Sequence, residues 1–197
     1  MVRIAEREYE KCVEKLKDLP WGSIQNDTYD NKSDFIYYVN SVDLVEKLSA
    51  INGCSFEYAL NRFYCYITSK KVEQILCKLG AKREKNERNH DIDVYINDIP
   101  FDIKLTVLPR LFKGENLKSR ETKNRLAGWY MNNASTGRRK QQCNRLYIVC
   151  TGSTYEECLA MKSDFCGIEE ACKEFLKYHK DRQFNVINGN YVDVIIV

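Results

Sequence analysis

The sequence predicts an α/β fold in which helices flank a central sheet, and three observations lead to this prediction. Apolar residues recur at helical spacing over much of residues 4–79, alternate with polar residues over residues 91–107, and form a short unbroken run over residues 146–150. Helical spacing marks the buried face of an amphipathic helix. Alternation marks a half-buried strand, and a short apolar run is consistent with a buried strand.

Three helices are predicted in the first 80 residues from their apolar spacing and their end signals. Ser33 and Ser55 are residue types that cap helix N-termini, and Gly53 and Gly80 are typical helix ends. The predicted segments are a helix over 4–19, a polar loop over 23–32, a helix from 33 to 52 and a helix from 55 to 79.

A β-hairpin is predicted over residues 91–107. Asn97-Asp98 is a turn signal, and the residues on both sides of it alternate between apolar and polar. The apolar face consists of Ile92, Val94 and Ile96 on the first strand, and of Phe101, Ile103, Leu105 and Val107 on the second.

The C-terminal half predicts a less regular series of elements. Residues 110–135 are basic and only weakly periodic, so no helix is assigned to them. A short helix over 136–144 leads into the strand at 146–150, a helix covers 155–179, and two short strands over 184–197 enclose the turn Asn188-Gly189. One domain is expected over 1–197, with a core at about 55–150, an N-terminal helical arm over 1–50, and a C-terminal helix and strands over 151–197.

Composition excludes several classes of protein. Hydrophobic residues make up 44% of the chain and aromatic residues 12%, which is enough for a core. No apolar run approaches the roughly 18–20 residues that span a bilayer, and the first residues lack a secretory signal. None of the nine cysteines forms a CxxC pair, so neither a zinc site nor a disulfide framework is expected. We therefore expect a cytoplasmic protein that does not enter membranes.

Positive charge is concentrated in one central segment. Residues 110–145 contain 10 Lys or Arg and 2 Asp or Glu, a net charge of +8. Residues 1–109 have a net charge of −2 and residues 146–197 of −3, although the whole chain has only +3. Such asymmetry favours a polyanionic partner over an ordinary solvated loop.

The polar face of the hairpin carries residues suited to phosphodiester hydrolysis. Asp91 and Asp93 share that face on the first strand, and Asp102, Lys104 and Thr106 share it on the second. If the two faces coincide, two carboxylates and an ammonium lie within a few ångströms. Carboxylates bind Mg²⁺, which activates water and stabilises phosphate charge, and the lysine adds positive charge. The alternative is an exposed hairpin with weak cross-strand ion pairs.

The runs His90-Asp91-Ile92-Asp93-Val94 and Phe101-Asp102-Ile103-Lys104 resemble the PD-(D/E)xK nuclease superfamily. The resemblance covers about half the chain, residues 55–150, and implies a restriction-endonuclease-like core of order αβββαβ, with a central mixed β-sheet flanked by helices. The order of the predicted elements agrees with that core.

The resemblance also implies roles for particular residues. Asp102 and Lys104 match the (D/E)xK pair, and the first acid is Asp93 or, alternatively, Asp91. A glutamate on the preceding helix, which supports the metal site in many members, corresponds to Glu57. The glutamine or lysine that some members carry on the following helix corresponds to Gln141 or Gln142.

The expected activity is Mg²⁺-dependent endonucleolytic cleavage of DNA, with Mn²⁺ able to replace Mg²⁺. A restriction-type or mobile-element enzyme acting on double-stranded DNA is the first interpretation, and cutting both strands would favour a homodimer. A structure-specific or repair nuclease, and a catalytically silent nucleic-acid-binding module, are the alternatives. Phosphate contacts are expected from the basic segment, at Lys123, Arg125, Arg138, Arg139 and Lys140.

Overall fold

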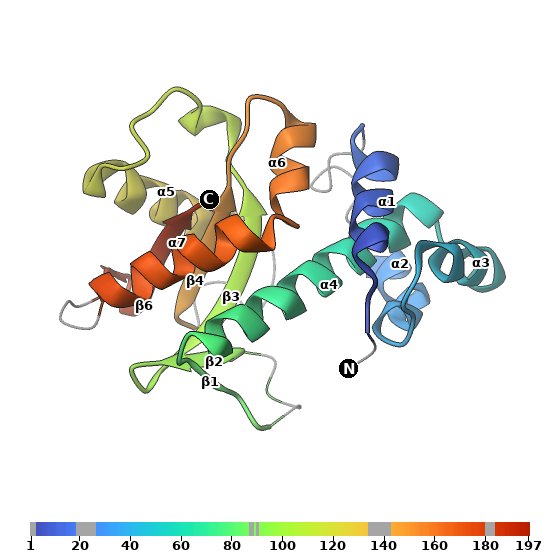
Figure 1. Ribbon diagram of the computed structural model, residues 1–197, viewed down its shortest axis with the longest axis horizontal. Coiled ribbons are helices and arrows are strands. Elements are labelled where there is room, and N and C mark those ends of the chain that lie inside the picture. The colour runs from blue at the N-terminus through green and yellow to red at the C-terminus, as the bar shows by residue number, and fades with distance from the viewer. Residues whose placement is uncertain (1–2, 19–26, 87–88, 90, 134–142, 180–183) are drawn as a thin grey trace. The chain divides into compact units, whose positions relative to one another are not determined.

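The protein is an α/β protein with a mixed, open sheet of six strands (Figure 1). The computed structural model describes residues 3–18, 27–86, 89, 91–133, 143–179 and 184–197, and seven α-helices lie within these ranges. The described chain divides into two compact units. We call Met1–Lys70 with Gly152–Ser163 the helical unit, and Lys71–Thr151 with Asp164–Val197 the strand unit. The expectation of a single domain over 1–197 stays a prediction.

The helical unit is built around one apolar core. Leu16, Val45, Phe63 and Leu159 come from four different helices and are all nearly or fully buried in this core. The elements of the unit are α1 (Glu6–Leu16), α2 (Asp27–Lys32), a short 3-10 helix (Asp34–Tyr37), α3 (Val42–Asn52), the first part of α4 (Phe56–Lys78), and α6 (Tyr155–Met161).

Two predictions for this unit were wrong. The predicted loop over 23–32 contains α2, and the helix predicted from 33 to 52 is broken between the 3-10 helix and α3. The break has a physical cause. The backbone N–H of Val42, at the start of α3, donates to the buried Glu8 carboxylate over 2.8 Å, and Ser41 caps the same helix by accepting from Leu44. A new N-terminus is therefore satisfied there by side chains.

The helix boundaries predicted at Gly53, Ser55 and Gly80 were correct. Ser55 accepts a hydrogen bond from the backbone N–H of Tyr58 at the start of α4. Gly53, at the end of α3, has φ of +61°, and Gly80, just beyond α4, has φ of +112°. Glycine adopts such backbone conformations at little cost, and this favours it at helix ends.

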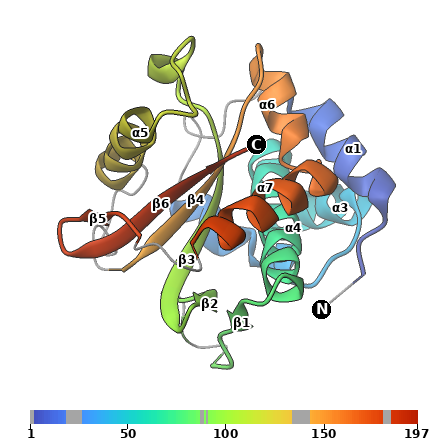
Figure 2. The same cartoon turned by 60° about the vertical axis from the view of Figure 1, so that its left-hand side comes forward.

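The strand unit contains the whole sheet, whose strand order is β1-β2-β3-β4-β6-β5. The β3–β4 and β4–β6 pairs are parallel, and the others are antiparallel. The strands are β1 (Lys82–Arg83), β2 (Val94–Ile96), β3 (Ile99–Val107), β4 (Arg145–Cys150), β5 (Val186–Ile187) and β6 (Asn190–Ile196). Helices α5 (Arg120–Asn133) and α7 (Phe165–Tyr178) cover the sheet on opposite sides (Figure 2).

The two faces of the sheet follow from strand register. Tyr147 and Val149 of β4 pack with Leu126 and Tyr130 of α5, so these β4 positions face α5. Their register partners on β3 are Lys104 and Thr106, and residues paired in register share a face. Asp102, Lys104 and Thr106 therefore share one face, as the alternation of the sequence predicted, and this face is the one that α5 covers.

On the opposite side, α7 is attached to β6 through a buried histidine. His179 Nε2 lies 3.1 Å from Asp193 Oδ2, and its Nδ1 lies 3.0 Å from the Phe175 carbonyl oxygen. The ring also stacks on Phe175, with a centroid separation of 4.0 Å, and on Phe184, at 5.0 Å. These contacts fix the end of α7 against the sheet.

Several predicted boundaries in the strand unit change. The first hairpin strand is only β2, and the charged strip before it contains β1, which pairs with β2. The basic segment contains α5, where no helix was predicted. Most of the helix predicted over 136–144 lies outside the described residues. The helix predicted over 155–179 is two helices, with Asp164 capping the second. The two strands around Asn188-Gly189 are confirmed.

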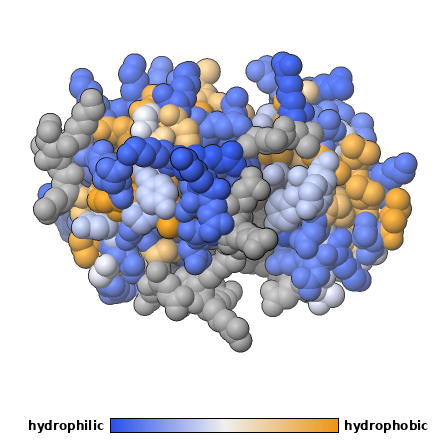
Figure 3. Space-filling view, turned by 90° about the horizontal axis from the view of Figure 1, so that it is seen from below, coloured by the Kyte–Doolittle hydropathy of each residue, from blue (hydrophilic) through white to orange (hydrophobic). Residues whose placement is uncertain are grey.

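The surface is mixed. No helix in the described part of the chain is long and apolar enough to cross a membrane. The face in Figure 3 is predominantly hydrophilic, with apolar side chains in small patches. The most exposed large apolar side chains are Tyr38 and Ile51 in the helical unit and Leu111 and Val186 in the strand unit. Single exposed apolar side chains are normal on protein surfaces. All nine cysteines are free thiols.

Candidate active site

The candidate site lies where β2 separates from β3. The two strands pair from Ile96–Ile99 to Val94–Phe101, and at the next residue β3 begins to pair with β4 instead. Asp93 is placed at this point by its backbone N–H, which donates to Phe101 O over 2.9 Å. Its carboxylate Oδ2 accepts the backbone N–H of Ile103 over 2.8 Å. The Asp93 side chain thus takes the place of the missing strand partner.

Asp102 lies beside this point on β3 and is buried, with 6% of its surface exposed. Its Oδ1 accepts a hydrogen bond from Lys104 Nζ over 2.7 Å, and its Oδ2 lies 3.5 Å from Arg145 Nε. The two oxygens of one carboxylate are therefore divided between two cations.

The pKa of the Asp102 carboxyl is raised from 3.8 to about 6. Burial is the main cause, because it removes water from the charged form, and the negative charge of Asp93 acts in the same direction. Lys104 and Arg145 oppose the rise by favouring the carboxylate. Two carboxylates that repel each other beside a lysine are a common feature of catalytic sites, though also of structural ion-pair networks.

Lys104 and Arg145 differ in accessibility. The Lys104 side chain is 47% exposed, so its ammonium can leave Asp102 for solvent or for a bound molecule. Arg145 is only 3% exposed. Its Nη1 donates to the hydroxyl of Tyr147 over 3.4 Å, and the Tyr147 ring stacks on Tyr130 of α5 with centroids 4.7 Å apart.

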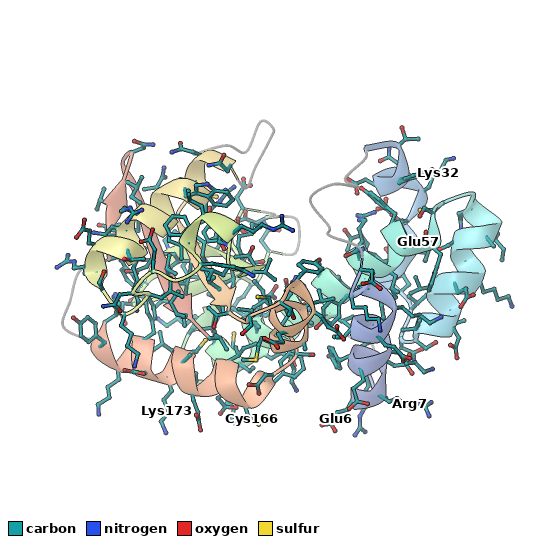
Figure 4. The ribbon with its side chains drawn as sticks, turned by 90° about the horizontal axis from the view of Figure 1, so that it is seen from above. Glu6, Arg7, Lys32, Glu57, Cys166 and Lys173 are labelled. Atoms are coloured by element: carbon teal, nitrogen blue, oxygen red, sulfur yellow. The ribbon has the colours of Figure 1, made fainter. Side chains whose placement is uncertain are left out.

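The remaining predicted acids take different positions. Asp91 is an exposed residue two positions before Asp93, so Asp93 is the acid that β2 brings to β3. Glu57 is exposed in the first turn of α4 within the helical unit (Figure 4). There it accepts a hydrogen bond from the Ser55 hydroxyl over 2.7 Å, and this bond is the main reason that its pKa is lowered. Glu57 is not among the residues that the strand unit brings together.

The predicted nucleic-acid contacts are only partly described. Arg138, Arg139, Lys140, Gln141 and Gln142 lie outside the described residues. Lys123 and Arg125 both belong to α5, the helix on the Asp102 side of the sheet.

Arg125 already has a structural role. Its guanidinium forms two hydrogen bonds with the Glu115 carboxylate, at 2.8 and 2.9 Å, and lies 5.7 Å from the centre of the Phe112 ring. These contacts fasten the segment before α5 to the helix. A phosphate contact from Arg125 would compete with the pair.

Sequence reasoning missed several buried charged residues of the strand unit, among them Arg145, Glu73 and Asp193. Arg145 was counted only as part of the basic segment, because its position opposite Asp102 depends on the pairing of strands that lie 38 residues apart along the chain. Glu73 on α4 is 6% exposed, and its charge contributes to raising the pKa of the Cys77 thiol, for which burial is the main cause. The spacing of apolar residues around Glu73 is the one signal that could have indicated its burial.

The donor set determines which metal could bind. Among the described residues, no group of three or more His, Cys, Asp and Glu side chains is arranged to hold a metal ion. Mg²⁺, however, is commonly held by one or two carboxylates and completes its octahedron with water. Asp93 and Asp102 supply that number of hard oxygen ligands, and a divalent cation would relieve their mutual repulsion. The residues present therefore fit Mg²⁺ better than a metal that requires a complete protein cage.

No family model matches the chain, and no curated protein or solved structure is significantly similar to it.

Proposed function

We propose that the protein is a Mg²⁺-dependent nuclease of the PD-(D/E)xK type, with Asp93, Asp102 and Lys104 as its catalytic residues. One observation carries this proposal. At the point where β2 leaves β3, the buried Asp102 carboxylate accepts a hydrogen bond from the Lys104 ammonium, and the nearby charge of Asp93, which accepts the Ile103 N–H, raises the Asp102 pKa. A buried carboxylate whose ionised form is disfavoured contributes little to the stability of the fold. A functional reason for the cluster is therefore the better explanation.

The order of elements supports the same proposal. In the order α4, β1, β2, β3, α5, β4, a helix precedes an antiparallel three-stranded meander, and a second helix connects β3 to the parallel strand β4. This is the αβββαβ order that the resemblance implies. Because a fold hosts many functions, the order supports the family assignment, while the argument for activity depends on the site.

Each catalytic residue has a distinct task. Asp93 and Asp102 would hold the metal through carboxylate oxygens, and Asp93 is itself oriented by the Ile103 N–H. Mg²⁺ supplies Lewis-acid stabilisation of the charge that develops on the phosphate. Lys104 is exposed enough to turn from Asp102 towards a phosphate oxygen or the attacking water, where its ammonium orients the water and offsets negative charge.

The proposed substrate is DNA, most favourably double-stranded. Arg120 and Lys123 lie in the first turns of α5, which covers the Asp102 side of the sheet, and Lys118 lies just before this helix. Cations on a DNA-binding surface neutralise backbone phosphates and position the strand without reading bases. Double-strand cutting by a single site per chain would further favour a two-fold dimer.

Incubation with plasmid DNA in Mg²⁺ or EDTA tests the proposal. We expect cleavage in Mg²⁺ and none in EDTA, and we expect Asp102→Ala to abolish cleavage while retaining the fold and most DNA affinity. Asp98→Asn is the matched control. Asp98 is an exposed aspartate of the same hairpin, paired with Lys82, and its substitution should leave the rate unchanged.

The pattern of results separates the alternatives. Wild-type cleavage rates in Asp102→Ala, with Mg²⁺ still required, would remove Asp102 from the site and overturn the proposal. Cleavage confined to junctions, nicks or RNA would identify a structure-specific nuclease. DNA binding without cleavage by the folded wild type would identify a silent binding module.

A further inference from the structure

The strongest feature not used by the proposed mechanism is the buried arginine beside Asp102. Arg145 opens β4 and is the register partner of Asp102 on the parallel strand β3. Residues paired in this way lie side by side on one face of a sheet. The next pair on the same face, two residues along, is Lys104 and Tyr147, so the four side chains form a compact polar cluster under α5.

Burial makes the position of Arg145 costly unless it is compensated. Arg145 and Asp102 are 3% and 6% exposed, and an unpaired buried charge is strongly destabilising. Compensation comes from the Asp102 carboxylate, with 3.5 Å between Arg145 Nε and Asp102 Oδ2, and from the Tyr147 hydroxyl, which accepts from Nη1. Arg145 is too deeply buried to meet a substrate itself.

Arg145 and Lys104 contact different oxygens of the Asp102 carboxylate, and these contacts define its orientation. Arg145 contacts Oδ2 from the buried side, and Lys104 contacts Oδ1 from the side open to solvent. The Tyr147 ring stacks on Tyr130 of α5, and the Tyr147 hydroxyl accepts a hydrogen bond from Arg145 Nη1. The packing of Tyr147 therefore restricts the position of the guanidinium. The contact between Arg145 Nε and Asp102 Oδ2 is an ion pair at 3.5 Å without a hydrogen bond, and it favours the orientation of the carboxylate in which Oδ2 faces the guanidinium and Oδ1 faces away from it.

We propose that Arg145 is a positioning residue, which holds Asp102 Oδ2 so that Oδ1 is presented to the divalent cation and to Lys104. This inference rests on the proposed function, because it assumes that Asp102 is a metal ligand. It assigns a role to a residue outside the Asp93, Asp102 and Lys104 set, on a strand that contributes none of the three.

Binding of Mn²⁺ to the full chain tests this role without any nuclease assay. Free Mn²⁺ can be counted by electron paramagnetic resonance during a titration. Loss of a side chain that orients a metal ligand typically weakens metal affinity about 10- to 100-fold, and we expect a weakening in this range for Arg145→Met. A cation that merely stood near the metal would have the opposite effect, since its removal would relieve repulsion and strengthen Mn²⁺ binding.

Two further variants keep the test decisive if Arg145→Met does not fold. Arg145→Lys retains the charge but not the planar guanidinium, and should bind Mn²⁺ more weakly than wild type. Asp102→Asn with Arg145→Met removes both buried charges. In the Asp102→Asn background, Arg145→Met should have no further effect on Mn²⁺ affinity, because the interaction through which it acts is gone.

Arg62→Met is the matched control. Arg62 is another largely buried arginine, 14% exposed, which pairs with Asp30 and Asp34 in the helical unit. Its replacement removes a comparable ion pair and should leave Mn²⁺ affinity at the wild-type value. Thermal unfolding of each variant shows whether any change in affinity reflects loss of folded protein.

The results distinguish this inference from the proposed function. Unchanged or stronger Mn²⁺ binding in folded Arg145→Met, or in Arg145→Lys if Arg145→Met does not fold, overturns the positioning role while leaving the nuclease proposal intact. Mn²⁺ binding that depends on Asp102 and Arg145, together with no cleavage of any nucleic acid, supports the positioning role and removes the nuclease. A folded wild type that binds no Mn²⁺ overturns both.

Discussion

At the scale of single residues, Asp102 combines a functional requirement with a cost to stability. Its carboxylate must be ionised to bind a metal, yet burial favours the protonated form and raises its pKa to about 6. Lys104 and Arg145 offset only part of this effect. Such opposition is common at functional sites, where groups are retained for chemistry even though they weaken the fold.

This opposition predicts a specific pH dependence of stability in the metal-free protein. Between pH 3.8 and about 6, folded protein keeps a proton on Asp102 that the unfolded chain has already lost. The contribution of Asp102 to the free energy of unfolding therefore falls as pH rises through this window and is constant above it. Relative to Asp102→Asn, wild type should lose on the order of 3 kcal/mol across the window.

Urea denaturation of wild type and Asp102→Asn, in EDTA at a series of pH values from about 3 to about 8, measures the difference directly. The substitution also leaves Arg145 without its carboxylate, but that adds the same offset at every pH. A difference that does not change with pH would show that the Asp102 carboxyl ionises equally well in the folded protein and the unfolded chain.

Lys104 should affect rate more than metal affinity. Its side chain is 47% exposed and carries no ligand atom for a cation, so Lys104→Met leaves both carboxylates available to Mg²⁺. We expect a loss of roughly 10²–10³-fold in cleavage rate, the usual range for a group that stabilises charge in the transition state, with Mn²⁺ affinity the same or higher. Rate and Mn²⁺ titration are measured on the same preparation. A large loss of Mn²⁺ binding would assign Lys104 a structural task at the metal site instead.

At the scale of secondary-structure elements, the β2–β3 hairpin aligns the site. Asn97 and Asp98 have φ of +52° and +63°, and the flanking pair is Ile96–Ile99. Two successive residues with positive φ form the tight turn that suits the twist of a hairpin. The resulting register places Asp93 next to Asp102, and a slip by one residue would turn Asp93 to the opposite face.

The turn itself gives a prediction about stability. Asp98→Val places a β-branched residue at positive φ and should lower the free energy of unfolding by about 1–2 kcal/mol. Asp98→Gly removes the same exposed pair with Lys82 but accepts the backbone conformation, and should change stability by less than about 1 kcal/mol. Chemical denaturation compares the two. Equal losses would mean that the pair with Lys82, and not backbone strain, sets the cost.

Local patterns explain why some elements were predicted and others were not. The hairpin and the tail strands follow from alternation and from Asn97-Asp98 and Asn188-Gly189, which act over a few residues. Helix α5 was missed because its many cations obscured a short apolar face. Leu126 and Tyr130 are buried four residues apart, and Ser119 accepts from the Thr122 N–H as a cap, so a signal was present.

At the scale of the whole molecule, the sequence predicts that Asp102 and Lys104 lie together on one strand, but it does not predict that Arg145 on β4 lies beside them. Asp102 and Lys104 are two residues apart and visibly share a face, whereas Arg145 joins them only through the parallel pairing of β3 and β4. Parallel partners are separated by a crossover connection, so no local spacing reveals their register. The division into two units was likewise not predicted, since neither composition nor a linker marks it.

Charge distribution is the other property of the whole molecule that bears on function. The net charge of +8 over residues 110–145 stands against negative charge in the rest of the chain. If this segment binds the nucleic-acid backbone, each phosphate that it neutralises releases a counterion. The logarithm of the binding constant then falls with the logarithm of salt concentration by about 0.9 for each contact.

Replacing Arg138 and Arg139 by Ala should flatten this salt dependence by roughly one to two units and weaken binding to all DNA sequences similarly. Binding isotherms at several salt concentrations, on two unrelated duplexes, give both quantities. Lys173→Ala with Lys177→Ala is the matched control, since it removes the same charge from exposed positions on α7, on the side of the sheet opposite Asp102. Lys173 is labelled in Figure 4.

The outcomes separate a local contact from net charge. An equal flattening of the salt dependence by both double variants would show that the effect comes from net charge alone. Loss of affinity for one duplex alone would show that Arg138 or Arg139 reads bases. If neither slope nor affinity changes, this arginine pair makes no contact with the backbone, and the case for a nucleic-acid substrate loses its electrostatic support.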